Sequence, residues 1–317
     1  MTRHREAAPL AVWSALGIVY VVWGSTYLAI AITVQTLPPL LAAGLRFSVA
    51  AILLLAWTIA RHGVAAARPG RAELRAAAIV GLLLFVGGNG MLQVAERTVP
   101  SGLAALIVAS LPLWIVVFRR VVGERIELST AVGVAIGFAG VAFLVFPRGT
   151  GAALDELGLG LTVAATISWS LGTFVSTRLQ LPRDTVMSTG YQQLIGGAGL
   201  IAVGLASGEA ARFDPATFSL RSIVALAYLI VFGSLIAFTA FGWVLQHAPV
   251  SKVATYAYVN PVIAVVLGAV INAEAITPSI LVGAAIIVAA VAFIVSREGA
   301  RQRAGRERAA PAGGEAN

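Results

Sequence analysis

The sequence contains no cysteine and only three histidines among its 317 residues. Without cysteine, the chain cannot form a disulfide bond or hold a metal ion through thiolates. The histidines fall in loops or at the ends of apolar segments, where imidazoles are usually solvated, at positions His4, His62 and His247. A phosphate-binding GxxxxGK[ST] loop is also missing, which argues against ATP hydrolysis by this chain. We therefore expect no metal site and no cofactor.

Charged residues are scarce as well. They make up 11% of the chain, hydrophobic residues make up 59%, and the mean hydropathy is +0.91. Soluble domains contain roughly 45 to 50% apolar residues, so this composition predicts an integral membrane protein. All fourteen acidic residues can be placed in loops, in tails or at the ends of apolar segments. The sequence therefore predicts no carboxylate in mid-membrane and gives no support for proton coupling.

Long apolar runs dominate what is present. Lipid leaves no backbone group unpaired, so an apolar run of about 20 residues is expected to cross the membrane as a helix. The pattern predicts an all-α integral membrane protein with ten transmembrane helices, near residues 10–32, 39–60, 75–94, 100–118, 129–146, 157–177, 186–206, 222–244, 250–271 and 278–296.

The basic residues predict the orientation in the membrane. Seventeen of the 22 Lys and Arg residues fall on one side of the predicted helices, four fall on the other side, and Arg46 lies within a span. Because cytoplasmic loops carry the excess of positive charge, we expect both termini to be cytoplasmic. The net charge of +8 lies in these loops and in residues 297–317, which we expect to form a disordered basic tail. No nucleic-acid partner is therefore expected.

The chain resembles itself at a fixed offset. Residues 132–145 and 282–295 share nine of fourteen positions, Glu124 corresponds to Glu274, and Trp23 corresponds to Trp169. Two repeats of five helices each are expected, at 1–148 and 149–296. Because five is odd, the second repeat must enter the membrane upside down, and such inverted repeats are typical of secondary transporters. The two glutamates precede the fifth and tenth helices, where a positive helix end favours a carboxylate.

Several motifs resemble a known family. They are WGSTYLAI at 23–30, PPLLAAGLRF at 38–47, VPSGLAALIVASLP at 99–112 and VSKVATYAYVNPVIAVVLG at 250–268. Together they resemble the two EamA repeats of the drug/metabolite transporter superfamily. The YAYVNP run and GNGM at 88–91 are similar to its YedA-like exporters. The resemblance implies ten helices around a central cavity.

Polar and aromatic side chains share helix faces at spacings of three or four residues, which places them on one side of a helix. As lining of the cavity we predict Trp23, Tyr27, Asn89, Trp169, Thr173, Tyr256 and Asn260. Ordinary hydrogen bonding between helices and an interfacial aromatic belt are the competing interpretations. Asn89 also shares a face with Gln93 and Glu96, and we expect Glu96 to be a solvated helix end.

Two prolines interrupt predicted helices, because proline leaves the carbonyl four residues earlier without its donor. For Pro112 the apolar surroundings favour a simple kink. For Pro261 the freed carbonyl belongs to Ala257, next to Tyr256 and Asn260, which favours a place in the cavity wall.

Arg46 is the one cation predicted inside a span. The repeat alignment places it opposite Gln192, and Phe47 opposite Gln193, so we include Arg46 and Gln192 in the cavity. An arginine at this depth costs roughly 2.5 to 3.5 kcal/mol to insert, so it needs a partner. Two interpretations stay open: binding an anionic substrate group, or holding backbone carbonyls between helices. A reach to the membrane surface is disfavoured, because Arg46 lies about 12 Å inside its helix at 1.5 Å per residue.

These features predict a secondary transporter and not an enzyme. We expect it to export small amphipathic metabolites or drugs, such as amino-acid-like or aromatic compounds, across the inner membrane by alternating access. Its partners would be a small-molecule substrate and membrane lipid, while the oligomeric state is not predicted. A carrier of phosphorylated or nucleotide-linked sugars is disfavoured, because phosphate sites usually gather several cations. An intramembrane enzyme would need a cluster of His, Asp, Glu or Cys, and the predicted spans contain none.

Overall fold

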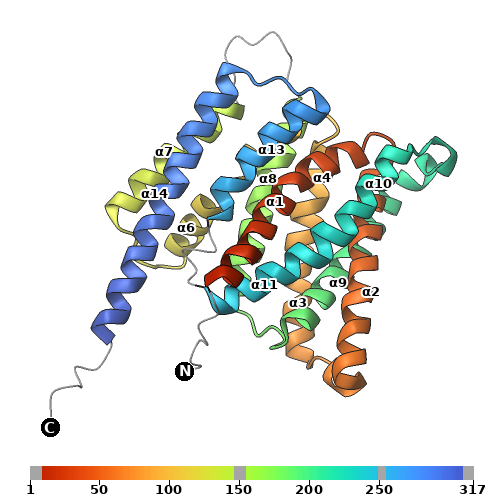
Figure 1. The fold of residues 1–317 in the computed structure, drawn as a ribbon, viewed down its shortest axis with the longest axis horizontal. Helices are drawn as coiled ribbons and strands as arrows, with labels where there is room; N and C mark the ends of the chain where they lie inside the picture. The colour runs from red at the N-terminus through yellow and green to blue at the C-terminus, as the bar shows by residue number, and fades with distance from the viewer. Residues whose placement is uncertain (1–8, 146–154, 249–254, 310–317) are drawn as a thin grey trace.

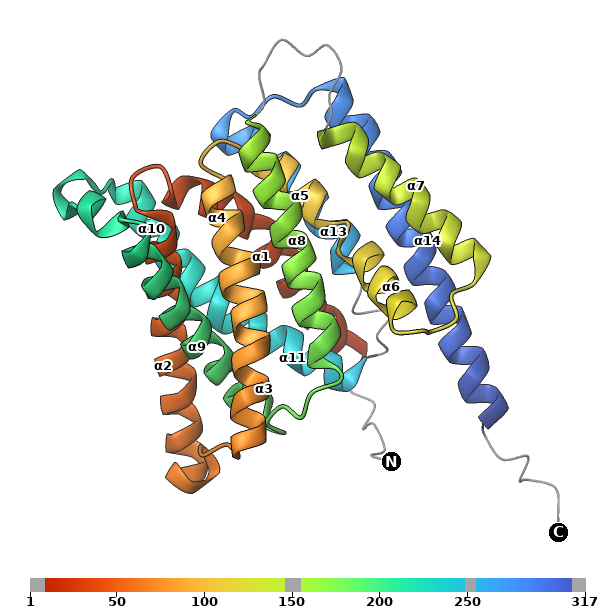
Figure 2. The same ribbon diagram turned by 180° about the vertical axis from the view of Figure 1, so that it is seen from behind.

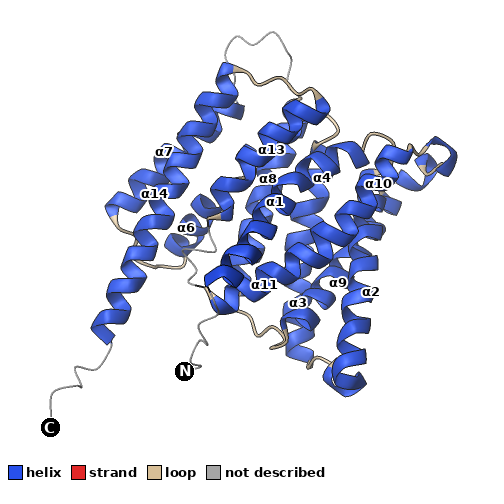
Figure 3. Cartoon of the chain, in the orientation of Figure 1, coloured by secondary structure: helices blue, strands red, loops and turns tan. Residues whose placement is uncertain are grey.

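The computed structural model describes residues 9–145, 155–248 and 255–309. Within these ranges the chain consists of helices and connecting loops, with no strand (Figure 3). The first half comprises α1 (Pro9–Thr33), α2 (Pro39–Ala66), α3 (Arg71–Gly81), η1 (Leu82–Gly90), α4 (Met91–Ala95), α5 (Ser101–Val108), α6 (Leu111–Val121) and α7 (Leu128–Val145). The second half comprises α8 (Glu156–Ser176), α9 (Thr185–Ala206), η2 (Glu209–Arg212), η3 (Pro215–Thr217), α10 (Leu220–Tyr228), η4 (Leu229–Ile236), α11 (Ala237–His247), α13 (Tyr256–Asn272) and α14 (Pro278–Ala309).

Within the described ranges, eight helical stretches are long and apolar enough to cross a membrane. Three of them are composite, because α3 continues through η1 into α4, α5 is followed by α6, and α10 continues through η4 into α11. The 22-residue helix α9 is more polar than these eight, since Gln192 and Gln193 lower its hydropathy. The apolar helix α13 is shorter, with 17 residues.

The helices pack in pairs that join the two halves of the chain (Figures 1 and 2). At one side of the molecule α2 lies along α9, and at the other side α7 lies along α14. Glycines allow the first pair to approach closely: a Cβ added to Gly44 would lie 3.0 Å from the carbonyl oxygen of Gly197. Small residues at helix contacts are the usual means of bringing membrane helices together.

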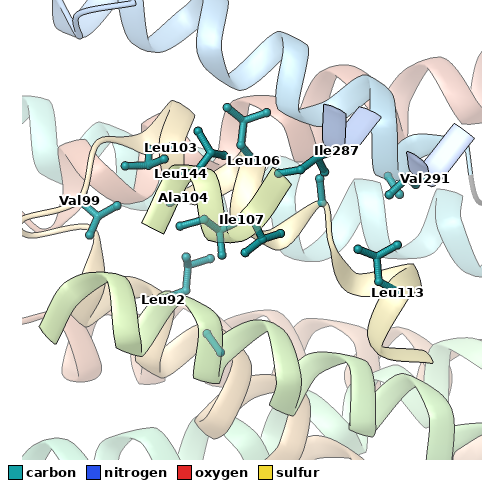
Figure 4. Close-up of a cluster of buried hydrophobic side chains, with 14 of the residues drawn as sticks. Leu92, Val99, Leu103, Ala104, Leu106, Ile107, Leu113, Leu144, Ile287 and Val291 are labelled. Carbon is teal, nitrogen blue, oxygen red and sulfur yellow. The ribbon is translucent and has the colours of Figure 1, made fainter. Parts of the chain in front are cut away.

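Between these pairs lies a buried apolar cluster (Figure 4). It joins α5 and α6 to α7 and α14 through Leu106, Ile107, Leu113, Leu144 and Ile287. Every residue of α5 from Ser101 to Ile107 is buried. A helix that is buried on all sides must be apolar on all sides, and the sequence of α5 meets that condition.

The two prolines that were predicted to break helices behave differently. Just before Pro112 a short turn interrupts the helix, since α5 ends at Val108 and α6 begins at Leu111, while Ala109 and Ser110 between them keep right-handed helical backbone angles. Helix α13 continues through Pro261, so the predicted break at that position is wrong. Proline there removes one backbone hydrogen bond, and the rest of the helix persists.

The basic segment 297–317 was predicted to be disordered, but α14 extends to Ala309. Its residues between 297 and 309 are mostly Ala, Arg, Glu and Gln, which have high helix propensity and prolong the helix beyond the apolar stretch. Residues 310–317 and the predicted boundary at 148–149 lie outside the described residues.

Candidate functional site

A cavity opens between α1, η1, α5, α8 and α13. It encloses about 830 Å³ when its open mouth is included. Seven of the nine predicted lining residues contribute to its wall, namely Trp23, Tyr27, Arg46, Asn89, Trp169, Tyr256 and Asn260. Pro261 also lines it, whereas Pro112 does not and its neighbour Leu111 does.

Thr173 and Gln192 are not part of this wall, so their prediction as lining residues is wrong. The hydroxyl of Thr173 donates to the carbonyl of Trp169 at 2.9 Å, one turn away on its own helix. The amide of Gln192 donates to Ser188 Oγ at 2.9 Å, again within one helix. Periodicity places a residue on a face of a helix, but it does not tell how far along that face a cavity extends.

Aromatic rings form one side of the cavity. The ring of Trp23 lies 5.1 Å from that of Phe238, 4.9 Å from that of Phe241 and 5.5 Å from that of Tyr256. Sequence reasoning missed Phe238, which lines the cavity, and Phe241, which packs on Trp23, although Ser234 lies four residues before Phe238 and Thr239 follows it. The centroid separations are those of favourable edge-to-face and tilted pairs.

The two tryptophans are connected through phenylalanines. Phe238 lies 5.9 Å from Phe85, whose ring is 6.4 Å from that of Trp169. Trp23 and Trp169 therefore stand at the two ends of a chain of rings. Each tryptophan also contacts a glycine in a π-helical segment of the other half.

Both glycines lie close to the tryptophan of the other half, and at Gly88 the contact leaves no room for a side chain. The indole nitrogen of Trp23 donates to the carbonyl of Gly233 in η4 at 3.4 Å. A Cβ added to Gly88 in η1 would lie 2.8 Å from Cε3 of Trp169. In the same segment the Asn89 amide donates to the Leu84 carbonyl at 3.4 Å. Helix segments of this kind are frequent at functional sites.

Arg46 is buried, with 3% of its surface exposed, and it bridges α2 to η4. Its Nε donates to Ser234 Oγ at 2.8 Å, and the guanidinium lies 4.5 Å from the ring centre of Phe47. Its Nη1 is buried, and no described residue accepts a hydrogen bond from it. Because the side chain also lines the cavity, Arg46 joins helices and keeps donor capacity for a ligand.

Ser234 also accepts a hydrogen bond from a second buried polar side chain, that of Gln193. The Gln193 amide, which is fully buried, donates to the carbonyl of Ser234 at 3.2 Å. The repeat alignment matched Arg46 with Gln192, but the neighbouring Gln193 is the glutamine that shares Ser234 with Arg46. Ser234 itself was missed, although it is the one polar residue in the run LIVFGSLI.

Asn260 ties α13 to α1 at the edge of the cavity. With its amide oriented to satisfy its neighbours, the nitrogen donates to the carbonyls of Tyr20 at 3.2 Å and of Tyr256 at 3.3 Å. The hydroxyl of Tyr20 is hydrogen-bonded to Thr255 in the same contact between helices.

Three glutamates differ from the sequence-based expectations in their burial or in their hydrogen-bond partners. Glu96, predicted to be solvated, is only 5% exposed, because α4 ends against α1 and the loop after α13. Glu274 accepts hydrogen bonds from the backbone of Ser101 and Gly102, at 3.1 and 3.0 Å, so it caps α5 and not its own helix. Glu124 accepts from Arg119 and Arg178, at 2.7 and 2.6 Å, instead of from a helix end.

An all-helical chain with eight apolar stretches of spanning length, packed around a polar and aromatic cavity, is a multi-pass membrane protein. The chain belongs to the EamA-like transporter family, whose pattern it matches twice, over residues 11–146 and 156–296.

Similar proteins cover nearly the whole chain. It is 38% identical over 294 residues to the uncharacterized inner membrane transporter YedA of Escherichia coli K12, covering 92% of both chains. It is 27% identical over 279 residues to a probable amino-acid metabolite efflux pump of Salmonella typhimurium, covering 86% of this chain and 90% of the pump. A solved crystal structure superimposes with a TM-score of 0.61 at 21% identity, over 92% of this chain and 98% of that one, which shows likeness of fold.

Proposed function

We propose that this protein is a secondary transporter that exports small amphipathic metabolites or drugs across the inner membrane. Amino-acid-like and aromatic compounds are the substrates that its cavity fits best. The observation that carries this proposal is the cavity itself, whose wall contains Trp23 with its neighbouring rings and also Arg46, whose buried Nη1 has no acceptor among the described residues. The similar proteins named as an inner membrane transporter and as an efflux pump for amino-acid metabolites support it.

The chemistry of the wall favours a substrate with a carboxylate and an apolar body. The guanidinium nitrogen of Arg46 can donate to an anionic group, and such charge-assisted hydrogen bonds are stronger than neutral ones. Trp23, Phe238 and Tyr256 offer ring faces and edges to an apolar or aromatic part. A phosphorylated sugar is less well matched, because Arg46 is the only Lys or Arg among the described residues of the wall.

We propose alternating access between two inverted repeats, residues 1–148 and 149–296, with ten helices in all. The pairing of helices supports it, because the main contacts between the halves have counterparts. Helix α1 packs on α13, and its counterpart α8 packs on α5 and α6. Helix α1 also packs along α10 and α11, and α8 packs along η1 and α4 in the same way. Repeats related in this way can rock about a central site and expose it to either side in turn. The distribution of basic residues supports cytoplasmic termini.

The test is exchange of labelled for unlabelled solutes across proteoliposomes, with a panel of amino acids and aromatic metabolites. We expect at least one solute with a carboxylate to exchange. Arg46→Gln should raise its half-saturation concentration by about tenfold or more, since a hydrogen bond to a charged group contributes about 1.5 to 3 kcal/mol.

Arg61→Gln is the matched control, because Arg61 lies on the same helix and is exposed, outside the cavity wall. We expect it to leave exchange unchanged. If Arg46→Gln were also silent for every solute that exchanges, the assignment of Arg46 to the site would be wrong. If no solute of the panel exchanged, the transporter proposal itself would fail.

A further inference from the structure

Glu96 is a buried carboxyl group at the end of α4. Its side chain is 5% exposed and lies near the backbone of Ala31, but no well-formed hydrogen bond reaches either oxygen from the described parts of the chain. Gln93, one turn earlier and 1% exposed, also has no hydrogen-bond partner for its side chain there. Buried polar groups of native proteins are nearly always paired, so this pair calls for a ligand.

Glu96 lies where two cavities meet. On α4, Leu92 lines the central cavity, whereas Glu96 lines a second cavity of about 590 Å³, including its open mouth. On α1, Ile30 lines the central cavity and Ala31 lines the second one. Glu96 therefore lines the second cavity one helical turn beyond Leu92, toward the side that would face outward in the orientation proposed above.

The charged and titratable groups around Glu96 come from several elements. Tyr27 of α1, Arg46 of α2 and Glu274 after α13 interact with it electrostatically, and Arg97 lines the same cavity. Glu274 is engaged in capping α5, and at the start of α8 Asp155 accepts from Thr98 Oγ1 at 2.7 Å. Arg46 is turned to Ser234, so within the described ranges no cation forms an ion pair with Glu96.

A proton matches this environment better than a metal ion. An ionised carboxylate without a partner is expensive to bury, and such groups become neutral by taking up a proton. A metal cation would need several oxygen ligands at short distance. Among the described residues no group of three or more His, Asp or Glu side chains could hold one.

A proton on Glu96 would affect the central cavity through Arg46. When Glu96 is ionised, its negative charge opposes an anionic ligand group beside the guanidinium, and this opposition disappears when Glu96 is protonated. Proton binding and anion binding therefore strengthen each other, and such coupling is reciprocal.

We propose that Glu96 is a proton-binding site, and that an anionic solute group binds beside Arg46 more tightly when Glu96 carries its proton. When Glu96 loses that proton, the binding of the solute weakens. The inference rests on the proposed transport function, but the proton site can be tested without any solute.

The first experiment is infrared spectroscopy of proteoliposomes that contain the full chain, titrated between about pH 5 and about pH 9, through which buried carboxyl groups titrate. We expect a carboxylic acid band near neutral pH that is missing from Glu96→Gln and kept in Glu124→Gln, whose carboxylate is exposed and ion-paired. Identical spectra for the unaltered protein and Glu96→Gln would overturn the proposal.

The second experiment uses L-phenylalanine, or the fastest solute of the exchange panel, at equal pH on both sides of the membrane. The carboxylate of phenylalanine keeps its charge across this range. For the unaltered protein the half-saturation concentration should rise at least about fivefold as Glu96 ionises, the lower end of usual coupling strengths.

Glu96→Gln imitates the protonated state, so its half-saturation concentration should not change with pH and should stay at the low value. A pH dependence equal to that of the unaltered protein would overturn the proposal. If no solute exchanged at all, the transport function would fail, while the infrared titration would still decide the proton site.

Discussion

At the scale of single residues, the site depends on polar and aromatic side chains that contact residues of neighbouring helices. Arg46 and Gln193, from the second helix of each predicted repeat, meet at Ser234, one binding its hydroxyl and the other its carbonyl. Trp23 and Trp169 each contact a glycine of the opposite half. The contacts of Arg46, Trp23 and Trp169 cross between the halves, so they couple the shape of the cavity to the way the halves are packed, whereas the Gln193 contact lies within the second half.

Gly88→Ala should displace Trp169, because the added Cβ would lie 2.8 Å from its ring. Forcing an extra carbon into a filled site costs about 1 to 3 kcal/mol, so we expect a lower Tm in detergent and a higher half-saturation concentration for solutes. Gly17→Ala is the control, since nothing lies within 4 Å of a Cβ at that position of α1. There alanine should hold or slightly raise the Tm, through its greater helix propensity. An unchanged Tm and unchanged exchange in Gly88→Ala would contradict the packing described above.

Sequence patterns predicted the lining of the cavity where polar and aromatic residues repeat every three or four positions, as with Trp23 and Tyr27. They failed where the burial or the contacts of a residue depend on how neighbouring helices pack against it. Glu96 stands near the end of an apolar segment, so its position alone favoured solvent, but α1 and the loop after α13 cover it. The choice between Gln192 and Gln193 depends on how α9 is rotated against η4, which a periodicity shared by both residues cannot show.

At the scale of elements, the third helix of each predicted repeat has the same irregularity. Residues Leu82–Gly90 in the first half and Leu229–Ile236 in the second form π-helices between α-helical ends. Each segment supplies the glycine that a tryptophan of the other half contacts. A wider helical turn leaves carbonyls less regularly paired, and the Asn89 amide donates to one of them, that of Leu84. Apart from their glycines, nothing in the residue pattern indicates these segments, since π-helices have no distinct periodicity.

Glu124 joins the end of α6 to the end of α8 through Arg119 and Arg178. The hydrogen bond from Arg119, together with the positive charge of both arginines, holds the pKa of the Glu124 carboxyl below its ordinary value of 4.5. A lowered pKa contributes stability above the ordinary value, and that contribution is lost as the pH falls through the lowered one.

We therefore expect Glu124→Gln to reduce the free energy of unfolding at neutral pH by less than about 1 kcal/mol, because the ion pairs of Glu124 with the two arginines are exposed. The Tm should fall slightly as a result. The difference from the unaltered protein should vanish in acid, where both chains carry a neutral side chain at this position. Thermal scans of both proteins in the same detergent at several pH values measure it. A difference that grew in acid would show that another group is responsible.

At the scale of the whole molecule, the paired contacts between the halves agree with a two-fold relation in the membrane plane. The helices that pair directly, α2 with α9 and α7 with α14, are the ones that the repeat alignment makes equivalent. The first pair is held by facing glycines, and α7 carries Gly137, where a Cβ would lie 3.3 Å from that of Ala290 on α14. Close pairs of this kind at the two edges leave the remaining helices to enclose the cavity between them.

The absence of cysteine makes the inverted arrangement directly testable, because each introduced thiol is the only one in the chain. His62 and Ser207 are exposed and follow equivalent helices, one near the end of α2 and the other just after α9. If the second repeat is inverted, these positions face opposite sides of the membrane. A membrane-impermeant maleimide should then label Ser207→Cys in intact spheroplasts and His62→Cys only after the membrane is opened. Labelling of both variants in intact spheroplasts, with the parent chain unlabelled, would mean that the repeats run the same way, and a rocking exchange between two faces would lose its structural basis.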